Sequence, residues 1–378
     1  MDMQSAIVYL DYNATTPLDD RVLERMLPYF KQQYANPSSP HLFGMQVLEE
    51  IEFAQEDLAY LIGCRAADLI FTSGATEAIN MAIKGIPEDH RKHIICAATE
   101  HNAVLACCRY LATTGYRVTY LPVDRYGMID LEMLQKSITC DTKLVCIMLV
   151  NNETGVIQDI QAIADITHQA GAWLLCDATQ AVGKIPIDVK KMGIDVMPLS
   201  AHKFYGPKGI GALYTNPDLK SLRPLIHGGQ QQGGIRSGTL NVPGIIGLGA
   251  AASIAKKEME LEKIKISKLR EFLEKSLLEI DGVFVNGHLE KRIYNTTNVC
   301  IPDIQSQEMI LALGNIAVSS GSACSSVTNK PSPVLKAMGL DDHHNRSAIR
   351  LSLGRFTSAD DIDYALERIK KIITKFRG

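Results

Sequence analysis

The sequence contains no pair of cysteines spaced as C-x-x-C, although it has nine cysteines among its 378 residues. An odd number of cysteines without such pairs argues against a disulfide framework and against a zinc ribbon. Cys96, Cys146 and Cys176 fall within apolar runs, where cysteine commonly packs as a small hydrophobic residue. Cys324 differs from them, because its neighbours in the stretch S-S-G-S-A-C-S-S are small and polar.

The sequence also lacks a run of lysine or arginine and any long apolar segment. Its formal net charge of −3 argues against a surface that binds nucleic acid. The most apolar stretches, 144–150 and 242–255, are shorter than a membrane span or are broken by glycine, and the first residues do not have the pattern of a signal peptide. We therefore expect a soluble, cytoplasmic protein that binds neither nucleic acid nor membranes.

Short apolar runs alternate along the chain with segments of helical pattern, which is typical of an α/β domain with a mostly parallel sheet. The runs are residues 68–72, 93–97, 143–150, 172–176 and 195–199. Farther on, residues 254–280 are rich in charge and carry apolar residues at three- and four-residue spacing. This pattern predicts a long amphipathic helix that leads to a second, smaller α/β unit. A last helix is predicted to start at T-S-A-D-D, near residue 358.

Polar side chains follow four of the predicted strands, at the point where each strand ends. They are His101, Asn152, Asp177, Gln180, Ser200, His202 and Lys203. Ligands of open parallel sheets bind outside the carboxyl ends of the strands, so these side chains are expected to meet at one edge. Each residue taken alone is as well explained by a helix cap or by an exposed polar group. Their recurrence at successive strand ends favours a shared site.

The segment F-T-S-G-A-T-E, residues 71–77, adds an expected anion site to this edge. Backbone N–H groups of Gly74, Ala75 and Thr76 at the start of a helix would bind a phosphate, although an ordinary capped helix fits the segment equally well. A phosphate site together with an aspartate, a lysine and a histidine matches the needs of pyridoxal 5'-phosphate. The lysine would bind its aldehyde, and the aspartate would keep its pyridine nitrogen protonated. No metal site is expected.

At these positions the chain closely resembles group I of the cysteine desulfurases, which are class V pyridoxal-phosphate enzymes. The matching stretches include Y-L-D-Y-N-A-T-T-P, N-P-S-S-P-H, F-T-S-G-A-T-E, T-E-H-N-A-V, N-N-E-T-G, D-A-T-Q-A-V-G, S-A-H-K-F-Y-G-P-K-G-I-G, I-R-S-G-T-L-N, S-S-G-S-A-C-S-S and I-R-L-S-L-G-R. The resemblance implies the type I fold of pyridoxal-phosphate transferases. In that fold a large domain, residues 16–258, has a mostly parallel seven-stranded sheet, and a smaller α/β domain, residues 1–15 and 259–378, carries the Cys324 loop.

The resemblance also implies roles for individual residues. Lys203 would hold the cofactor, His101 would stack on its ring and act as an acid–base group, and Cys324 would be the nucleophile. The other cofactor-binding residues would be Ala75, Thr76, Ser200 and His202 at the phosphate, Asp177 at the pyridine nitrogen, Asn152 and Gln180 near the ring hydroxyl, and Thr239 from the second subunit of a homodimer. The substrate would be bound by Arg350, Asn152 and Asn36, with the Arg350 fork on its carboxylate.

The implied reaction takes sulfur from L-cysteine, releases L-alanine and leaves a persulfide on Cys324. A sulfur-acceptor protein, such as an iron–sulfur scaffold or a thiol carrier, would then receive the sulfur. Two alternative enzymatic interpretations have the same fold and cofactor, namely a selenocysteine lyase and a class V aminotransferase. A third interpretation is a non-enzymatic adaptor that has the fold but no catalytic activity. The presence of all the expected site residues argues against it; they are Lys203, Asp177, His101, Cys324 and Arg350.

The chain departs from the family pattern at two places. Gln232 and Gly233 stand before R-S-G-T where relatives often have a charged pair, and Pro333 stands where a histidine is common. Between Cys324 and Pro333 the chain is rich in serine and low in packing residues. We expect roughly residues 325–332 to be poorly ordered without substrate or partner, so that the thiol can reach the cofactor and then an acceptor.

Overall fold

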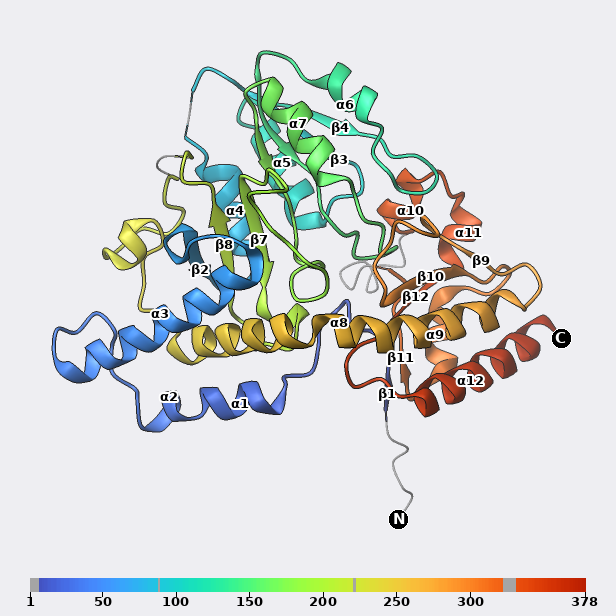
Figure 1. The fold of residues 1–378 in the computed structure, drawn as a ribbon. Helices are drawn as coiled ribbons and strands as arrows, with labels where there is room; N and C mark the ends of the chain where they lie inside the picture. The colour runs from blue at the N-terminus through green and yellow to red at the C-terminus, as the bar shows by residue number, and fades with distance from the viewer. Residues whose placement is uncertain (1–6, 88, 220–221, 322–330) are drawn as a thin grey trace.

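A computed structural model describes residues 7–87, 89–219, 222–321 and 331–378. It contains a seven-stranded sheet, a three-stranded sheet and a two-stranded ribbon (Figure 1). Within the described residues, none of the helices is long and apolar enough to cross a membrane.

The seven-stranded sheet has the strand order β2-β8-β7-β6-β5-β3-β4. Its strands are β2 (Leu69–Thr72), β3 (His93–Ala97), β4 (Arg117–Leu121), β5 (Thr142–Cys146), β6 (Trp173–Leu175), β7 (Val196–Ser200) and β8 (Gly211–Thr215). The pairs within β7-β6-β5-β3-β4 are parallel, and β8 runs antiparallel to both of its neighbours. The predicted mostly parallel sheet is therefore confirmed, and each predicted apolar run overlaps one of its strands.

Helices cover both faces of this sheet. The helices are α1 (Asp20–Met26), α2 (Pro28–Lys31), α3 (Leu42–Ile62), α4 (Ala75–Gly85), α5 (Asn102–Ala112), α6 (Leu131–Ser137), α7 (Ile160–Gln169) and α8 (Val242–Leu278), with short 3₁₀ turns η1 (Ala66–Asp68), η2 (Ala201–Lys203) and η3 (Gln231–Gly234). Buried side chains of α4 and α5 form one core with strand residues such as Cys96 and Leu144. Those of α3, α6, α7 and α8 form a second core with strand residues such as Ile95 and Val145. Adjacent residues of one strand thus serve opposite faces, as the pleat requires.

The C-terminal part of the chain forms the second α/β unit. Its elements are β9 (Phe284–Val285), β10 (Thr296–Cys300), α9 (Ser306–Leu313), β11 (Ile316–Ala317), α10 (Pro333–Ala337), α11 (Asp342–Arg346), β12 (Ala348–Ser352) and α12 (Ala359–Arg377). Strand β10 lies between β9 and β12, and the N-terminal strand β1 (Val8–Tyr9) pairs in parallel with β11. That pairing agrees with an assignment of the first residues to this unit, while the domain boundaries at 15/16 and 258/259 stay a prediction.

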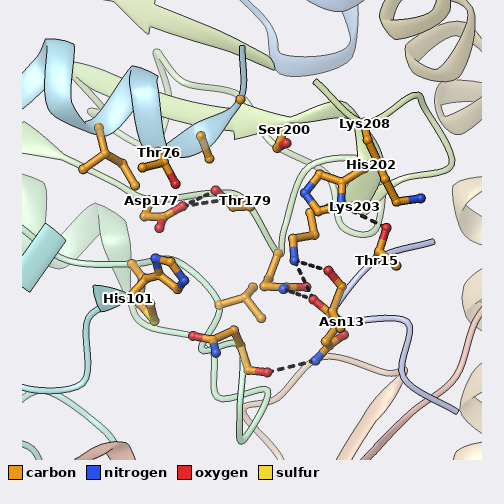
Figure 2. A pocket seen from close by; sticks show the side chains of 18 of the residues that line it. Asn13, Thr15, Thr76, His101, Asp177, Thr179, Ser200, His202, Lys203 and Lys208 are labelled. Atoms are coloured by element: carbon orange, nitrogen blue, oxygen red, sulfur yellow. Dashed lines mark hydrogen bonds between the residues drawn. The ribbon is translucent and has the colours of Figure 1, made fainter. Parts of the chain in front are cut away.

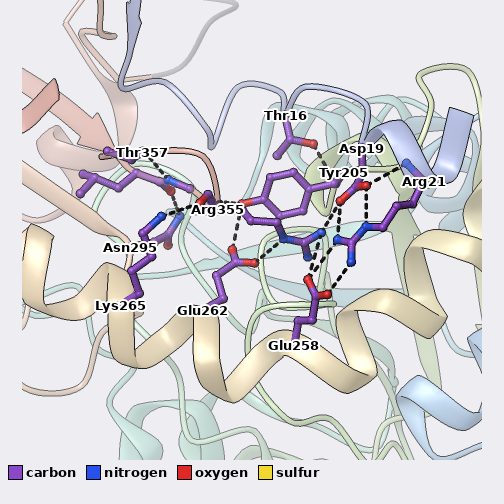
Figure 3. Close-up of polar contacts among 12 residues, drawn as sticks. Thr16, Asp19, Arg21, Tyr205, Glu258, Glu262, Lys265, Asn295, Arg355 and Thr357 are labelled. Atoms are coloured by element: carbon purple, nitrogen blue, oxygen red, sulfur yellow. Dashed lines mark hydrogen bonds and ion pairs between the residues drawn. The ribbon is translucent and has the colours of Figure 1, made fainter. Parts of the chain in front are cut away.

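One arginine ties the two parts of the molecule together. Arg355, after β12, pairs with Asp19 at 2.6 Å and with Glu262 of α8 at 3.0 Å (Figure 3). Its guanidinium also lies 4.2 Å from the ring centre of Tyr205, whose hydroxyl donates to Glu262. These contacts attach the C-terminal unit to the chain just after Lys203.

Candidate active site

A cavity of about 500 Å³ opens at the carboxyl ends of the parallel strands (Figure 2). Ten residues predicted from the sequence line it: Ala75, Thr76, His101, Asn152, Asp177, Gln180, Ser200, His202, Lys203 and Arg350. They come from the start of α4, from the ends of β3, β6 and β7, from the turn at 151–154 and from β12. The expected convergence of strand ends is thus present in the fold.

The wall formed by the N-terminus of α4 is suited to an anion. Gly74 precedes α4 with a φ of 152° and no side-chain oxygen caps the first turn. Gly211 of β8 lies directly against this turn, because a Cβ at Gly211 would be 2.7 Å from Cα of Gly74. Ser200 and His202 line the same cavity. Uncapped N–H groups at a helix start, together with hydroxyl and imidazole groups, are suited to bind a phosphate.

His202 contributes a neutral ring to this wall. Its Nδ1 lies 3.1 Å from the hydroxyl of Thr15, and burial together with the nearby Lys203 charge lowers the pKa of His202 to about 4. The imidazole is therefore uncharged near pH 7, and it can take part in hydrogen bonds without adding a positive charge.

His101 and Asp177 lie close to each other deeper in the cavity (Figure 2). Nδ1 of His101 accepts a hydrogen bond of 3.1 Å from the backbone N–H of Ala103, so in the neutral ring the proton is on Nε2. Burial lowers the pKa of His101, while the Asp177 carboxylate acts in the opposite direction. Oδ1 of Asp177 accepts hydrogen bonds from the backbone N–H and the hydroxyl of Thr179, at 2.9 and 2.5 Å. Both side chains are thereby fixed in orientation.

Lys203 reaches the other side of the cavity from η2, just after β7. Its Nζ donates to the backbone carbonyls of Asn13 at 2.8 Å and Ala14 at 2.7 Å. The same Asn13 carbonyl accepts from the side-chain amide of Gln180 at 2.8 Å. The N-terminal segment therefore positions the lysine and the glutamine together.

Arg350 is held by partners on two sides. Its Nη2 pairs with Asp11 at 2.6 Å, and its Nη1 donates to the carbonyl of Asn152 at 2.9 Å. Nε of Arg350 is buried and has no hydrogen-bond partner among the described residues. The side chain is only 2% exposed, so the guanidinium is fixed beside the cavity rather than free in solvent. A buried charge of this kind requires such pairing.

Two predicted site residues are not part of the cavity wall, and a third lies outside the described residues. Asn36 and Thr239 are exposed and do not line the cavity of their own chain. Cys324 lies outside the described residues, as do residues 325–330. The segment predicted to be poorly ordered was expected to extend to about residue 332, and this is wrong for Ser332. Ser332 is only 5% exposed, and its hydroxyl caps α10 by accepting a hydrogen bond from the N–H of Leu335. This serine is fixed because a helix begins immediately after it.

The cavity also contains residues that the sequence reasoning missed. They are Asn13, Ala14, Thr15, Ser73, Glu77, Ile79, Met148, Val150, Thr179, Lys208 and Gly209. The signal for the first three was present in the stretch Y-L-D-Y-N-A-T-T-P, which served only to mark the resemblance. Thr179 was available as the second residue after Asp177.

The sequence profile of the class-V aminotransferase family matches residues 8–365. The chain belongs to this family. It is 48% identical over 377 residues to a cysteine desulfurase IscS of Ehrlichia chaffeensis, and the match covers 98% of this chain and 92% of that protein. A cysteine desulfurase IscS of Rickettsia bellii is 46% identical over 376 residues, with 98% and 92% covered. These relatives confirm the resemblance that the motifs indicated.

Solved structures of class-V members have the same fold. A NifS-like protein superposes with a TM-score of 0.92 at 38% identity, and the match covers 98% of this chain and 100% of that one. A NifS-like protein from Rickettsia africae gives a TM-score of 0.89 at 34% identity, covering 97% and 99%. The type I fold expected from the sequence is thus confirmed.

Class-V aminotransferases use pyridoxal 5'-phosphate, and the donor set of this cavity fits that cofactor. The uncapped start of α4 suits its phosphate, Asp177 suits its pyridine nitrogen, and Lys203 is the amine that can bind its aldehyde. The ring of His101 lies beside Asp177, where it can stack on an aromatic ligand. No group of three or more metal-ligating side chains occurs within the described part of the chain.

Proposed function

We propose that this class-V aminotransferase is a cysteine desulfurase, which takes the sulfur atom from L-cysteine and releases L-alanine. One observation carries the proposal. Lys203, Asp177, His101 and Arg350, which come from separate parts of the chain, line one cavity, and the backbone of Arg350 pairs with Ser319 of the S-S-G-S-A-C-S-S stretch. The base, the carboxylate site and the start of the segment that carries the only cysteine with small polar neighbours are therefore adjacent. The names of the relatives, cysteine desulfurase IscS, agree with this reading.

Each residue has a defined task in the proposed reaction. Bound pyridoxal 5'-phosphate supplies an aldehyde for the substrate amine and a ring that withdraws electrons from Cα. Asp177 holds the proton on the ring nitrogen, and Lys203 removes the proton from Cα of the substrate. Arg350 binds the substrate carboxylate with Asn152 beside it, and Asn36 would complete that site. His101, with its proton on Nε2, exchanges protons with the substrate.

The sulfur leaves the substrate by attack of the Cys324 thiolate. A bond forms between Sγ of Cys324 and the substrate sulfur, while the bond between that sulfur and substrate Cβ breaks. The electron pair remains with the carbon side, and a proton then completes the methyl group of L-alanine. The products are a persulfide on Cys324 and L-alanine, so atoms and electrons balance without an added oxidant or reductant. Only the thiolate form of Cys324 attacks.

The persulfide requires an acceptor, which we take to be a thiol of an iron–sulfur scaffold or of a carrier protein. We further propose that the enzyme is a homodimer. Thr239 and Asn36 are exposed and do not line the cavity of their own chain, as expected of residues that act on a second subunit. The chain on either side of Asn36 also exposes Phe30 of α2, Tyr34 in the connection that follows, and Leu42 at the start of α3.

The proposal is tested by incubating pure protein with L-cysteine and a thiol reductant and measuring L-alanine and sulfide. Lys203→Ala is expected to abolish both products, and Cys324→Ala to abolish the persulfide. Cys140→Ala, which removes an exposed cysteine outside the cavity, is the matched control and is expected to behave as wild type. If Cys324→Ala released sulfide at the wild-type rate, the nucleophile would be another group.

The same assay separates the alternatives. An aminotransferase would produce pyruvate-type keto acids and would need a keto acid as amino acceptor. A selenocysteine lyase would leave L-cysteine unchanged. Formation of L-alanine from L-cysteine in the absence of a keto acid would exclude both.

A further inference from the structure

Glu153 is a buried carboxyl group that the proposed reaction does not use. It is 1% exposed and follows Asn152 in the motif N-N-E-T-G, but it does not line the cavity. A buried carboxyl group is costly unless it has hydrogen-bond partners. The partners of Glu153 therefore indicate why it is there.

The turn that carries Glu153 is rigid. The side-chain carbonyl of Asn151 accepts hydrogen bonds from the N–H groups of Glu153 and Thr154, at 2.9 and 3.0 Å. The carbonyl of Glu153 accepts from the side chain of Asn298 at 3.2 Å. On the cavity side of the same turn, the carbonyl of Asn152 accepts from Nη1 of Arg350. In this short turn Asn152 thus lines the cavity, whereas the side chain of Glu153 points away from it.

The Glu153 carboxyl group contacts a residue on each side of the undescribed segment 322–330, Gly321 before it and Ser332 after it. The hydroxyl of Ser332 donates to its Oε2 at 2.5 Å. Gly321 lies against the same oxygen, because a Cβ on Gly321 would be only 2.7 Å from Oε2. Two positions eleven residues apart in sequence therefore meet at one oxygen atom.

Each of these flanking residues is also attached to the fold independently. Gly321 N–H donates to the hydroxyl of Ser319, and the backbones of Ser319 and Arg350 exchange two hydrogen bonds, of 2.6 and 3.2 Å. Ser332 and Asn345 exchange two more, from the N–H of Ser332 at 2.7 Å and to its carbonyl at 2.9 Å. Glu153 is the group that joins these two attachments to each other and to the turn beside the cavity.

We propose that Glu153 is a positioning residue for sulfur transfer, which holds the two ends of the segment bearing Cys324 at a fixed place relative to the substrate site. This inference rests on the proposed role of Cys324. It assigns no contact between Glu153 and the substrate, so the steps that precede attack on sulfur do not need it. Loss of the carboxyl group is expected to impair attack by the thiolate and to spare proton removal at Cα.

The test separates these two steps in the holoenzyme. Proton removal is followed by the exchange of the Cα hydrogen of L-alanine for deuterium in D₂O, which needs Lys203 but not a thiol. Sulfur transfer is followed by the single-turnover appearance of a persulfide on Cys324 with L-cysteine, detected by mass. For Glu153→Ala we expect Cα exchange within about twofold of wild type and persulfide formation slowed by about tenfold or more, since small misplacements of a reacting group have effects of that size.

A second readout does not depend on activity. Amide hydrogen exchange in Glu153→Ala is expected to increase in both peptides 316–321 and 331–338, whereas Ser332→Ala is expected to increase it only in 331–338. Glu153→Gln keeps an acceptor for Ser332 and is expected to restore both persulfide formation and protection to near wild type. It also keeps the proposal testable if the alanine variant does not fold.

Matched controls test two simpler explanations, namely that loss of any helix cap, or alanine at any glycine with a positive φ, would slow persulfide formation. Ser358→Ala deletes a helix cap of the same kind as Ser332, but at α12 and away from Glu153. Gly321→Ala is compared with Gly115→Ala, which also has a positive φ but has no atom within 4 Å of its Cβ position. Both controls are expected to keep the persulfide rate, and Gly321→Ala to lower it.

Three results would overturn the inference. They are equal slowing of both steps in Glu153→Ala, no slowing of persulfide formation, and a change of amide exchange at one end only. A failure of the proposed function is recognised separately, because wild-type enzyme would then exchange the Cα hydrogen without forming a persulfide on Cys324.

Discussion

Among single residues, Lys184 has an unusual environment for an amine. It is 4% exposed, and its Nζ donates to the side-chain carbonyl of Gln180 at 2.8 Å. That bond fixes the orientation of the Gln180 amide, whose NH₂ group then donates to the carbonyl of Asn13, the same oxygen that accepts from Lys203. Burial, with a smaller contribution from the Lys203 charge, lowers the pKa of Lys184 to about 7.

The low pKa of Lys184 has a measurable consequence for stability. Between pH 7 and the ordinary lysine pKa, the unfolded chain binds one proton more than the folded chain at this position, so raising the pH stabilises the folded state. Lys184→Met removes this dependence. The free energy of unfolding of wild type is therefore expected to rise, relative to Lys184→Met, by about 1 kcal/mol per pH unit between pH 7 and 9.

Denaturant unfolding of the two proteins at several pH values measures the effect. Lys190→Met is the control, because Lys190 is exposed and its replacement should leave the pH dependence unchanged. A constant difference between wild type and Lys184→Met across this range would mean that Lys184 is charged when buried.

Seven of the predicted site residues were identified because they follow strands, and the reason is physical. The carboxyl ends of parallel strands meet at one edge, so a pattern local in sequence fixed the place of His101, Asp177 and Lys203. The role of Asn13 could not be obtained in this way. It depends on the pairing of β1 with β11 and on contacts with residues more than a hundred positions away, such as Asn152 and Thr296.

At the level of elements, the amphipathic helix predicted for 254–280 is observed, but α8 begins at Val242. Its first turns, V-P-G-I-I-G-L-G-A-A-A, are mostly buried and carry no charged residue, so they lack the charged face that revealed the rest. Gly249 permits α3 to approach closely, because a Cβ there would lie 2.5 Å from Cα of Ala54. The start of α12 was predicted correctly from the stretch T-S-A-D-D, and in the structure Ser358 and Asp361 form a reciprocal capping box there.

The junction of β8 and α4 provides a prediction about cofactor binding. A Cβ at Gly211 would lie 2.4 Å from the carbonyl of Leu199 and 2.7 Å from Cα of Gly74, so Gly211→Ala must displace the start of α4. Displacement of the N–H groups that are expected to bind the phosphate should raise the dissociation constant of pyridoxal 5'-phosphate about tenfold, a loss of about 1.4 kcal/mol.

Titration of the cofactor-free protein with pyridoxal 5'-phosphate, followed by absorbance, gives the dissociation constant. Gly171→Ala serves as the control, because an alanine there strains the backbone at a φ of +68° but meets no atom within 4 Å of its Cβ position, so the start of α4 is not displaced. An unchanged affinity in Gly211→Ala would show that the first turn of α4 does not bind the phosphate.

For the whole molecule, α8 runs without a break through the predicted boundary between residues 258 and 259. The network of Arg355, Asp19 and Glu262 lies at this place (Figure 3). Hydrogen bonding to Arg21, assisted by Arg355, lowers the pKa of Asp19 to about 2, so the Asp19 carboxylate remains charged throughout the neutral range. Such contacts favour a fixed relation between the two parts, which a sequence pattern cannot reveal because the partners lie far apart in the chain.

The proposed homodimer can be tested through Thr239, which is exposed and lies outside the cavity of its own chain. If Thr239 reaches the phosphate of the second subunit, Thr239→Ala lowers cofactor affinity at its neighbour's site and leaves its own site intact. Lys203→Ala, in contrast, inactivates its own site. A mixed dimer of the two variants therefore contains one doubly altered site and one site with no altered residue.

Such mixed dimers, made by unfolding and refolding two differently tagged variants together, are expected to recover one site of normal cofactor affinity and activity per dimer. The measurement is L-alanine formation at limiting pyridoxal 5'-phosphate, where Thr239→Ala alone is expected to be weak and Lys203→Ala alone inactive. If Thr239 acted within its own chain, every site of the mixed dimer would carry an altered residue and no recovery would be seen. Recovery would thus establish both the dimer and the exchange of Thr239 between its two sites.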